Sequence, residues 1–172
     1  MEARRLMPLD NDTVLADPCA AISVVRAAMP NIVGTVITDA DAHHVSMEMR
    51  LAPSLEFKPH GYPVEWVRIV VRRGTNPPAA YPLRAGLTWY HRYPTIKGER
   101  VSGKLCLWYP KDPEHLKWRW ADGFEQFIML VHKHLLGEEY FRRHGEWPWV
   151  DAPHGERADG RPHPVPGRLM SA

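Results

Sequence analysis

The spacing of apolar positions along the chain predicts a helix near its start. Residues 17–29, DPCAAISVVRAAM, repeat apolar side chains at helical intervals on one face, at Ile22, Val25 and Met29. Asp17 is a suitable N-cap and Pro18 suits the first helical position. The segment is therefore predicted to be an amphipathic helix, with Cys19 in its first turn.

Four strand-like segments follow this helix. Residues 32–40 and 43–51 are joined by a link short enough for a hairpin, and the second alternates apolar and polar positions, with one face formed by Val45, Met47, Met49 and Leu51. Residues 64–73 and 84–93 are predicted as the third and fourth strands. The connection at 74–83 is too rich in proline for a regular central strand. Sequential antiparallel strands with such links form a meander.

A helical period returns near the C-terminal end. Apolar residues recur three or four positions apart at Phe124, Phe127, Ile128, Val131 and Leu135. Gly137 is predicted to interrupt this helix, residues 138–144 to form a second short helix, and Gly145 to cap that helix. The pattern predicts an α+β fold with one helix before a four-stranded antiparallel meander and two helices after it.

The segment between sheet and helix, residues 94–119, has no clear period. A long stretch of this kind inside a compact domain is usually functional or disordered, and its Leu, Cys, Trp and Tyr content argues against disorder. One domain is predicted over residues 1–155. Residues 156–172 are polar and rich in proline and glycine, which predicts a flexible tail.

Composition and charge restrict the class of protein. The 172 residues are 44% hydrophobic with a net charge of +2, and no Lys/Arg block suggests a nucleic-acid partner. No apolar stretch is long enough to span a membrane, and no secretory signal is recognisable. Cys19 and Cys106 are too few for a disulfide framework, so we expect reduced thiols in the cytoplasm. No CxxC or Cys/His cluster is present, so neither a metal nor a cofactor is expected.

The order of these elements, together with four local motifs, resembles the ubiquitin-conjugating enzyme (UBC) family. NPPAAYPL (76–83) resembles the proline-rich crossing before the fourth strand of that family, and HRYP (91–94) lies where its His-Pro-Asn segment lies. GKLCLW (103–108) resembles the segment around the catalytic cysteine. GEWPWVDAPHG (145–155) resembles the ending of prokaryotic UBC-like proteins, which include the conjugating domain of CBASS anti-phage systems. The resemblance covers residues 15–155.

The resemblance implies a transferase that acts through a cysteine thioester. Cys106 would receive the C-terminus of a ubiquitin-like protein or of a cGAS-like nucleotidyltransferase, with or without a separate activating enzyme, and pass it to an amine or a second thiol. His91 corresponds to a histidine that is largely structural in the family. No asparagine follows residues 91–94, so His91, Tyr93 and the backbone N–H groups around Cys106 are all candidates for stabilising the oxyanion.

The residues alone leave other functions open. Cys106 could be a buried, inert cysteine, and Lys104, Arg100 and His91 are the local groups that would favour its thiolate. The alternatives to conjugation are an inactive UBC-like binding module and a cysteine hydrolase with His91 as base.

Several further residues have a simpler structural interpretation. His132 and His134, which lie two positions apart on a helix, are expected to be solvated, and Cys19 to be packed rather than reactive. Asp112 and Asp122 could tune an incoming amine, although a helix cap is the simpler role for Asp122. A core position is predicted for the aromatic series Trp118, Trp120, Phe124 and Phe127.

Overall fold

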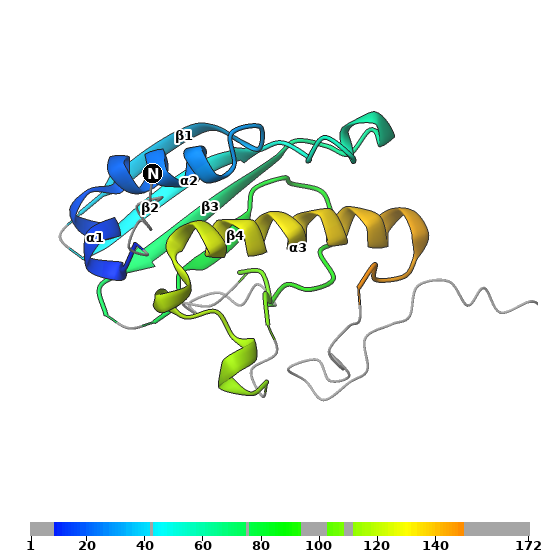
Figure 1. Ribbon diagram of the computed structural model, residues 1–172. Helices are drawn as coiled ribbons and strands as arrows, with labels where there is room; N and C mark the ends of the chain where they lie inside the picture. Colours follow the sequence, from blue (N-terminus) through cyan, green and yellow to red (C-terminus); the bar gives the residue numbers. More distant parts are fainter. Residues whose placement is uncertain (1–8, 42, 75, 94–102, 109–111, 150–172) are drawn as a thin grey trace, which may run out of the picture.

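The computed structural model describes residues 9–41, 43–74, 76–93, 103–108 and 112–149 (Figure 1). Its helices and strands are α1 Asn11–Ala16, α2 Pro18–Ala28, β1 Val33–Ala40, β2 His44–Leu51, β3 Glu65–Arg72, β4 Ala79–Pro82 and α3 Phe124–His144. Three single 3-10 turns, η1 Lys58–His60, η2 Glu114–Leu116 and η3 Trp120–Asp122, complete the described elements. The predicted α+β layout with a four-stranded antiparallel sheet is confirmed.

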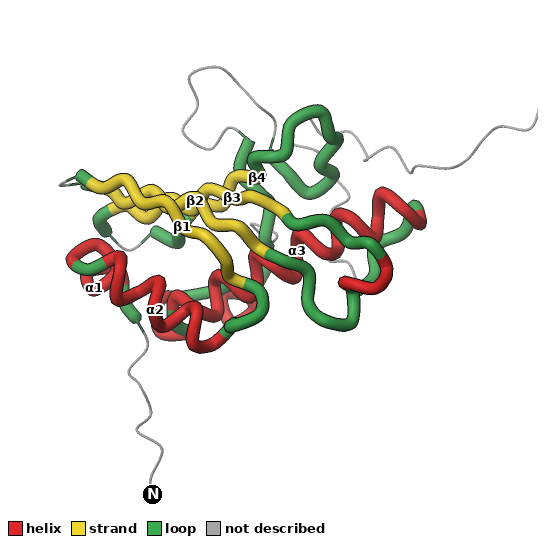
Figure 2. The backbone as a smooth tube through the Cα atoms, turned by 90° about the horizontal axis from the view of Figure 1, so that it is seen from above, coloured by secondary structure: helices red, strands yellow, loops and turns green. Residues whose placement is uncertain are grey.

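The sheet is a meander with strand order β1-β2-β3-β4. Met47 of β2 pairs with Thr38 of β1 and with Ile69 of β3, and the alternate residues of β2 on that face are all buried. The helices lie on one side of the sheet (Figure 2). The period of two along β2 therefore places one apolar face against the helices, as the sequence predicts.

The fourth strand is not where the sequence predicts it. The prediction of a strand at 84–93 is wrong: β4 forms in the proline-rich segment, where Pro82 lies opposite Val67. The strand is at the edge of the sheet, where a residue without an N–H is tolerated. The residues that follow leave the sheet, and Arg92 forms only an isolated bridge with Leu105.

Two short helices, not one, precede the sheet. Asp10 caps α1 by accepting a hydrogen bond from the Thr13 N–H at 2.8 Å, and Val14 is fully buried. A six-residue helix has too few apolar positions to show a period. In α2 the predicted cap is confirmed, because Asp17 accepts from the Ala20 N–H at 2.9 Å.

Helix α3 is continuous, so the prediction of two C-terminal helices separated at Gly137 is wrong. The glycine serves packing instead. A Cβ at Gly137 would lie 2.5 Å from Trp149 Cζ3 and 2.7 Å from Trp147 Cη2. The chain after α3 therefore folds back onto the helix at the one position that has no side chain. Gly145, with φ of 76°, ends α3 as predicted.

Both sides of α3 are covered, which corrects the prediction of solvated histidines. His132 and His134 are each 7% exposed. The Nε2 atom of His132 lies 2.9 Å from the Ala52 carbonyl oxygen, and His134 faces Glu138. Positions two apart on a helix point away from each other, so both are buried only because α3 is covered on opposite sides.

The predicted aromatic core is confirmed. Trp118, Phe124 and Phe127 are buried, and Trp120 is half-buried against Trp118 with 5.0 Å between ring centroids. Asp122 accepts a hydrogen bond from the Arg119 N–H at 2.7 Å and so caps η3, the turn that leads into α3.

Among the described helices, none has the length and apolar character needed to cross a membrane. Neither cysteine is in a disulfide: Cys19 is exposed on α2, and Cys106 is partly exposed. The predicted tail, residues 156–172, lies outside the described residues.

Replacing Phe127 with Ala is expected to lower the free energy of unfolding by about 3–5 kcal/mol, because a fully buried phenyl ring leaves a cavity. Met129 on the same helix is 43% exposed, and its replacement by Ala is expected to cost less than about 0.5 kcal/mol. Urea denaturation measures both. Equal effects of the two substitutions would contradict the observed orientation of α3.

Replacing Gly137 with Ala is expected to destabilise the protein, although Ala normally favours a helix interior by about 1 kcal/mol over Gly. The new methyl group would meet Trp147 and Trp149, and overpacking of this kind costs about 1–3 kcal/mol. Urea denaturation followed by tryptophan fluorescence measures the change. A gain in stability would show that the two tryptophans do not pack on α3.

Candidate active site

The segment that carries Cys106 is held by backbone hydrogen bonds on both sides. The Leu105 N–H donates to the Ala80 carbonyl of β4 at 2.8 Å, and the Cys106 N–H donates to the His91 carbonyl at 2.7 Å. The Tyr93 N–H donates to the Lys104 carbonyl at 2.9 Å. Residues 104–106 therefore lie between the sheet edge and residues 91–93, which fixes the backbone around the cysteine.

Gly103 permits the chain to enter this arrangement. Its φ is 76°, and its carbonyl accepts a hydrogen bond from Arg92 Nε at 2.6 Å. A Cβ at this position would lie 2.6 Å from Arg92 Nη2. The glycine of the GKLCLW motif therefore has a local reason: its backbone conformation is one that residues with a side chain rarely adopt, and a side chain here would also displace the Arg92 guanidinium.

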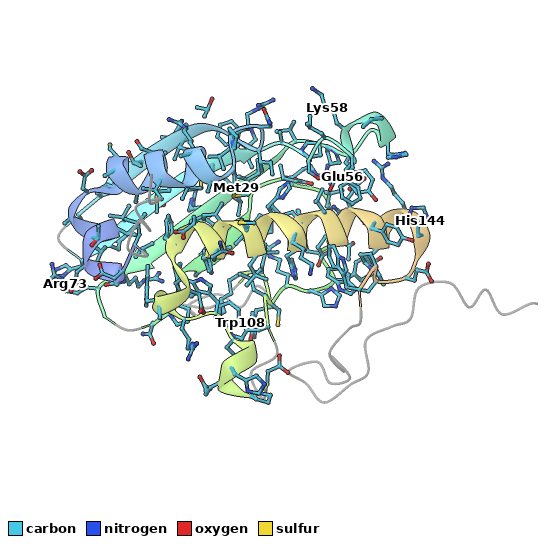
Figure 3. The ribbon with its side chains drawn as sticks, in the orientation of Figure 1. Met29, Glu56, Lys58, Arg73, Trp108 and His144 are labelled. Atoms are coloured by element: carbon cyan, nitrogen blue, oxygen red, sulfur yellow. The ribbon has the colours of Figure 1, made fainter. Side chains whose placement is uncertain are left out.

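Apolar neighbours anchor the loop and leave the thiol near the surface. Leu105 is 3% exposed and belongs to the core, while Leu107 and Trp108 are half-buried against it. Trp108 is labelled in Figure 3, on the loop beneath α3. Cys106 is a partly exposed residue, and its thiol donates to the Trp108 carbonyl at 3.4 Å. The cysteine is thus neither a fully buried core residue nor part of a loose loop.

A phenol and an ammonium group are close to the sulfur. The side chains of Tyr93 and Cys106 are hydrogen-bonded, and burial together with the Cys106 side chain raises the pKa of Tyr93 to about 12. Tyr93 therefore remains a neutral donor at physiological pH. Lys104 lies over the Tyr93 ring, with Nζ 4.9 Å from the centroid, and burial lowers its pKa while the Cys106 charge opposes that change.

His91 is buried against α3. Its ring centroid lies 4.1 Å from that of Trp147, and its Nδ1 lies 3.5 Å from Glu138 Oε1. Its backbone N–H donates to the same Glu138 oxygen at 2.7 Å, and its carbonyl accepts from Cys106. These contacts are those of a histidine that fixes the loop.

The structure brings together four of the residues that the sequence singled out: Cys106, His91, Tyr93 and Lys104. Two of the backbone N–H groups considered for the oxyanion, at Leu105 and Cys106, already donate to carbonyl groups. Their hydrogen bonds leave the Tyr93 phenol as the best-placed of the named donors.

Other candidate residues are elsewhere. Cys19 lies on α2. Asp112 is partly exposed beyond the cysteine segment, and Arg100 is outside the described residues. Within the described ranges, no group of three His, Cys, Asp or Glu side chains could hold a metal ion.

Glu138 and Trp147 belong to this region, although sequence reasoning missed both. Glu138 is fully buried and contacts the backbone of residues 90 and 91, and Trp147 covers His91. A glutamate within an amphipathic helix normally faces solvent, and the GEWPW motif indicated only how the chain ends. The signal for Glu138 is its helical spacing from His134, four residues earlier.

No protein-family model, curated protein or solved structure matches this chain. Any assignment of function therefore rests on the geometry around Cys106 and on the motifs in the sequence.

Proposed function

We propose that this protein is a ubiquitin-conjugating-like transferase in which Cys106 carries an acyl group as a thioester. The observation that carries the proposal is the position of the thiol. Cys106 is a partly exposed residue on a loop with a fixed backbone, and its sulfur is hydrogen-bonded to the neutral phenol of Tyr93. A buried structural cysteine needs neither exposure nor a polar donor beside its sulfur.

The reaction has two steps. In the first, the Cys106 thiolate attacks the carbonyl carbon of an activated C-terminus, a carbon–sulfur bond forms, and the leaving group departs with its electron pair. That leaving group is an adenylate phosphate or another thiolate. In the second step an amine attacks the thioester, the carbon–sulfur bond breaks, and the amine nitrogen loses a proton to solvent. Catalysis consists of positioning and charge stabilisation.

Tyr93 is proposed to take the part that an asparagine plays in the UBC family. In each step the carbonyl oxygen carries negative charge in the tetrahedral intermediate, and the Cys106 sulfur carries it before the first step and after the second. A phenol with a pKa of about 12 keeps its proton and donates it to either atom as a hydrogen bond. The Lys104 ammonium adds positive charge on the same side, because it lies over the Tyr93 ring.

The acyl donor in this proposal is a protein. The UBC-like motifs favour the C-terminus of a ubiquitin-like protein or of a cGAS-like nucleotidyltransferase, as part of anti-phage defence of the CBASS type. A catalytically inactive module that holds such a tail is the second candidate. It is favoured by the absence of an asparagine after residues 91–94.

Replacing Cys106 with Ala is expected to abolish thioester formation, and Cys106→Ser to form a more stable oxyester or no adduct. The assay mixes the chain with a ubiquitin-like protein or nucleotidyltransferase from a neighbouring gene, its C-terminus converted chemically to a thioester. Non-reducing gels with and without dithiothreitol detect the adduct.

Cys19→Ala is the matched control and should leave the adduct unchanged, because Cys19 is exposed on α2 and its thiol has no role in the proposal. An adduct that persists in Cys106→Ala and disappears in Cys19→Ala would overturn the assignment. The absence of any adduct with either partner would favour the binding module, and turnover of the thioester without an adduct would favour a hydrolase.

Replacing Tyr93 with Phe is expected to slow alkylation of Cys106 by iodoacetamide at pH 7.5 by roughly three- to tenfold, since the thiolate loses a hydrogen bond of about 1 kcal/mol. Intact-mass spectrometry in the Cys19→Ala background measures the rate. Tyr81→Phe, on β4, is the control and should not change it. A rate that is unchanged in Tyr93→Phe would show that the phenol does not stabilise the thiolate.

A further inference from the structure

Glu138 is a carboxylate with no exposed surface, and both of its oxygens bind backbone amides of one loop. Oε2 accepts from the Tyr90 N–H at 3.0 Å, and Oε1 accepts from the His91 N–H at 2.7 Å. Helix α3 therefore holds the backbone of residues 90 and 91 through the Glu138 carboxylate.

The surroundings of Glu138 keep it ionised. His91 Nδ1 lies 3.5 Å and His134 Nε2 lies 3.6 Å from Oε1, and Arg142 Nη1 lies 3.8 Å from Oε2. Burial alone would raise the pKa of this carboxyl, but the nearby His134 and His91 side chains and the His91 backbone N–H hold it well below its usual range. A carboxylate, unlike an amide, offers an acceptor to both backbone N–H groups at once.

The same loop residue holds the cysteine. The His91 carbonyl accepts the Cys106 N–H at 2.7 Å, so the path from α3 to the cysteine is one side chain, one peptide segment and one backbone hydrogen bond. Trp147 lies against the His91 ring on this path, with 4.1 Å between centroids.

We infer that Glu138 is a positioning residue for Cys106: it fixes residues 90 and 91, and through the His91 carbonyl it fixes the backbone that presents the thiol. The inference rests on the proposed function of Cys106. The buried carboxylate serves geometry: the acyl group must contact both the Cys106 sulfur and the Tyr93 phenol, so the backbone that carries the sulfur must be held in place. A small displacement of the sulfur relative to the acyl carbon costs a large factor in rate.

The test compares Glu138→Gln with Glu139→Gln. A glutamine has one acceptor oxygen, so at least one of the two backbone N–H groups loses its partner in Glu138→Gln. Glu139 is adjacent in sequence, but its carboxylate binds Arg84, Arg142 and Arg143 instead of residues 90 and 91. The control therefore removes a neighbouring, partly buried charge that makes no hydrogen bond to residues 90 and 91.

Two readouts are expected to change in Glu138→Gln. Hydrogen exchange at the amides of His91 and Cys106 should accelerate by at least about tenfold relative to Glu139→Gln. Acylation of Cys106 by a glycine-ended peptide with a C-terminal sulfonatoethyl thioester should slow on the order of tenfold. Alkylation by iodoacetamide needs no positioned acyl group, so it should slow by a smaller factor than acylation does.

Unchanged exchange at the Cys106 amide in Glu138→Gln would overturn the inference, and so would an equal fall in acylation and alkylation. If the wild-type chain takes no acyl group, the proposed function fails, while the exchange data still decide whether Glu138 holds Cys106. If Glu138→Gln does not fold, native-state exchange of the wild type decides instead. The Tyr90, His91 and Cys106 amides should then open together, and separate opening of Cys106 would contradict the inference.

Discussion

The carboxylate of Glu138 is the interaction on which the candidate site depends. It lies within α3 and accepts hydrogen bonds from two consecutive backbone amides of a segment that has left the sheet. The Tyr90 and His91 N–H groups find their acceptors in this carboxylate and not in a neighbouring strand, and an unsatisfied buried amide costs about 1–3 kcal/mol. The Arg142 guanidinium and the imidazoles of His91 and His134 lie close to this buried charge. One side chain thus replaces a missing strand, and the loop beside it holds Cys106.

This arrangement explains why α3 is buried on two sides. One side packs on the sheet through Phe127, Val131 and their neighbours, and the other faces His91 and Trp147. Gly137 leaves room for Trp147 and Trp149 to pack against the helix. His134 and Glu138 lie one turn apart on this second side. The fold therefore uses one helix both as the main core element and as the support of the loop that carries the cysteine.

The sequence predicts those helices and strands in which apolar residues recur at a regular spacing. Strands β1 to β3, helix α2 with its Asp17 cap and the apolar stripe of α3 follow from alternation, helical spacing and capping chemistry. The fourth strand was misplaced because prolines at a sheet edge resemble a loop. The sequence does not predict the second buried side of α3, because His134 and Glu138 are polar. Whether a polar side chain is buried depends on tertiary contacts that the sequence pattern does not show. Motifs identify Cys106 and His91. The backbone hydrogen bond between them, and the support that Glu138 gives to His91, exist only in the folded structure.

The central claim is that the Cys106 thiol accepts an acyl group and releases it to a second nucleophile. Its most direct measurement is time-resolved intact-mass spectrometry of the wild-type chain mixed with a peptide thioester, followed by addition of hydroxylamine. The claim predicts a gain equal to the mass of the acyl group, located at Cys106 by digestion at low pH and lost on addition of hydroxylamine. An acyl group found on Cys19 alone, or no mass gain while the peptide thioester remains intact, would contradict it.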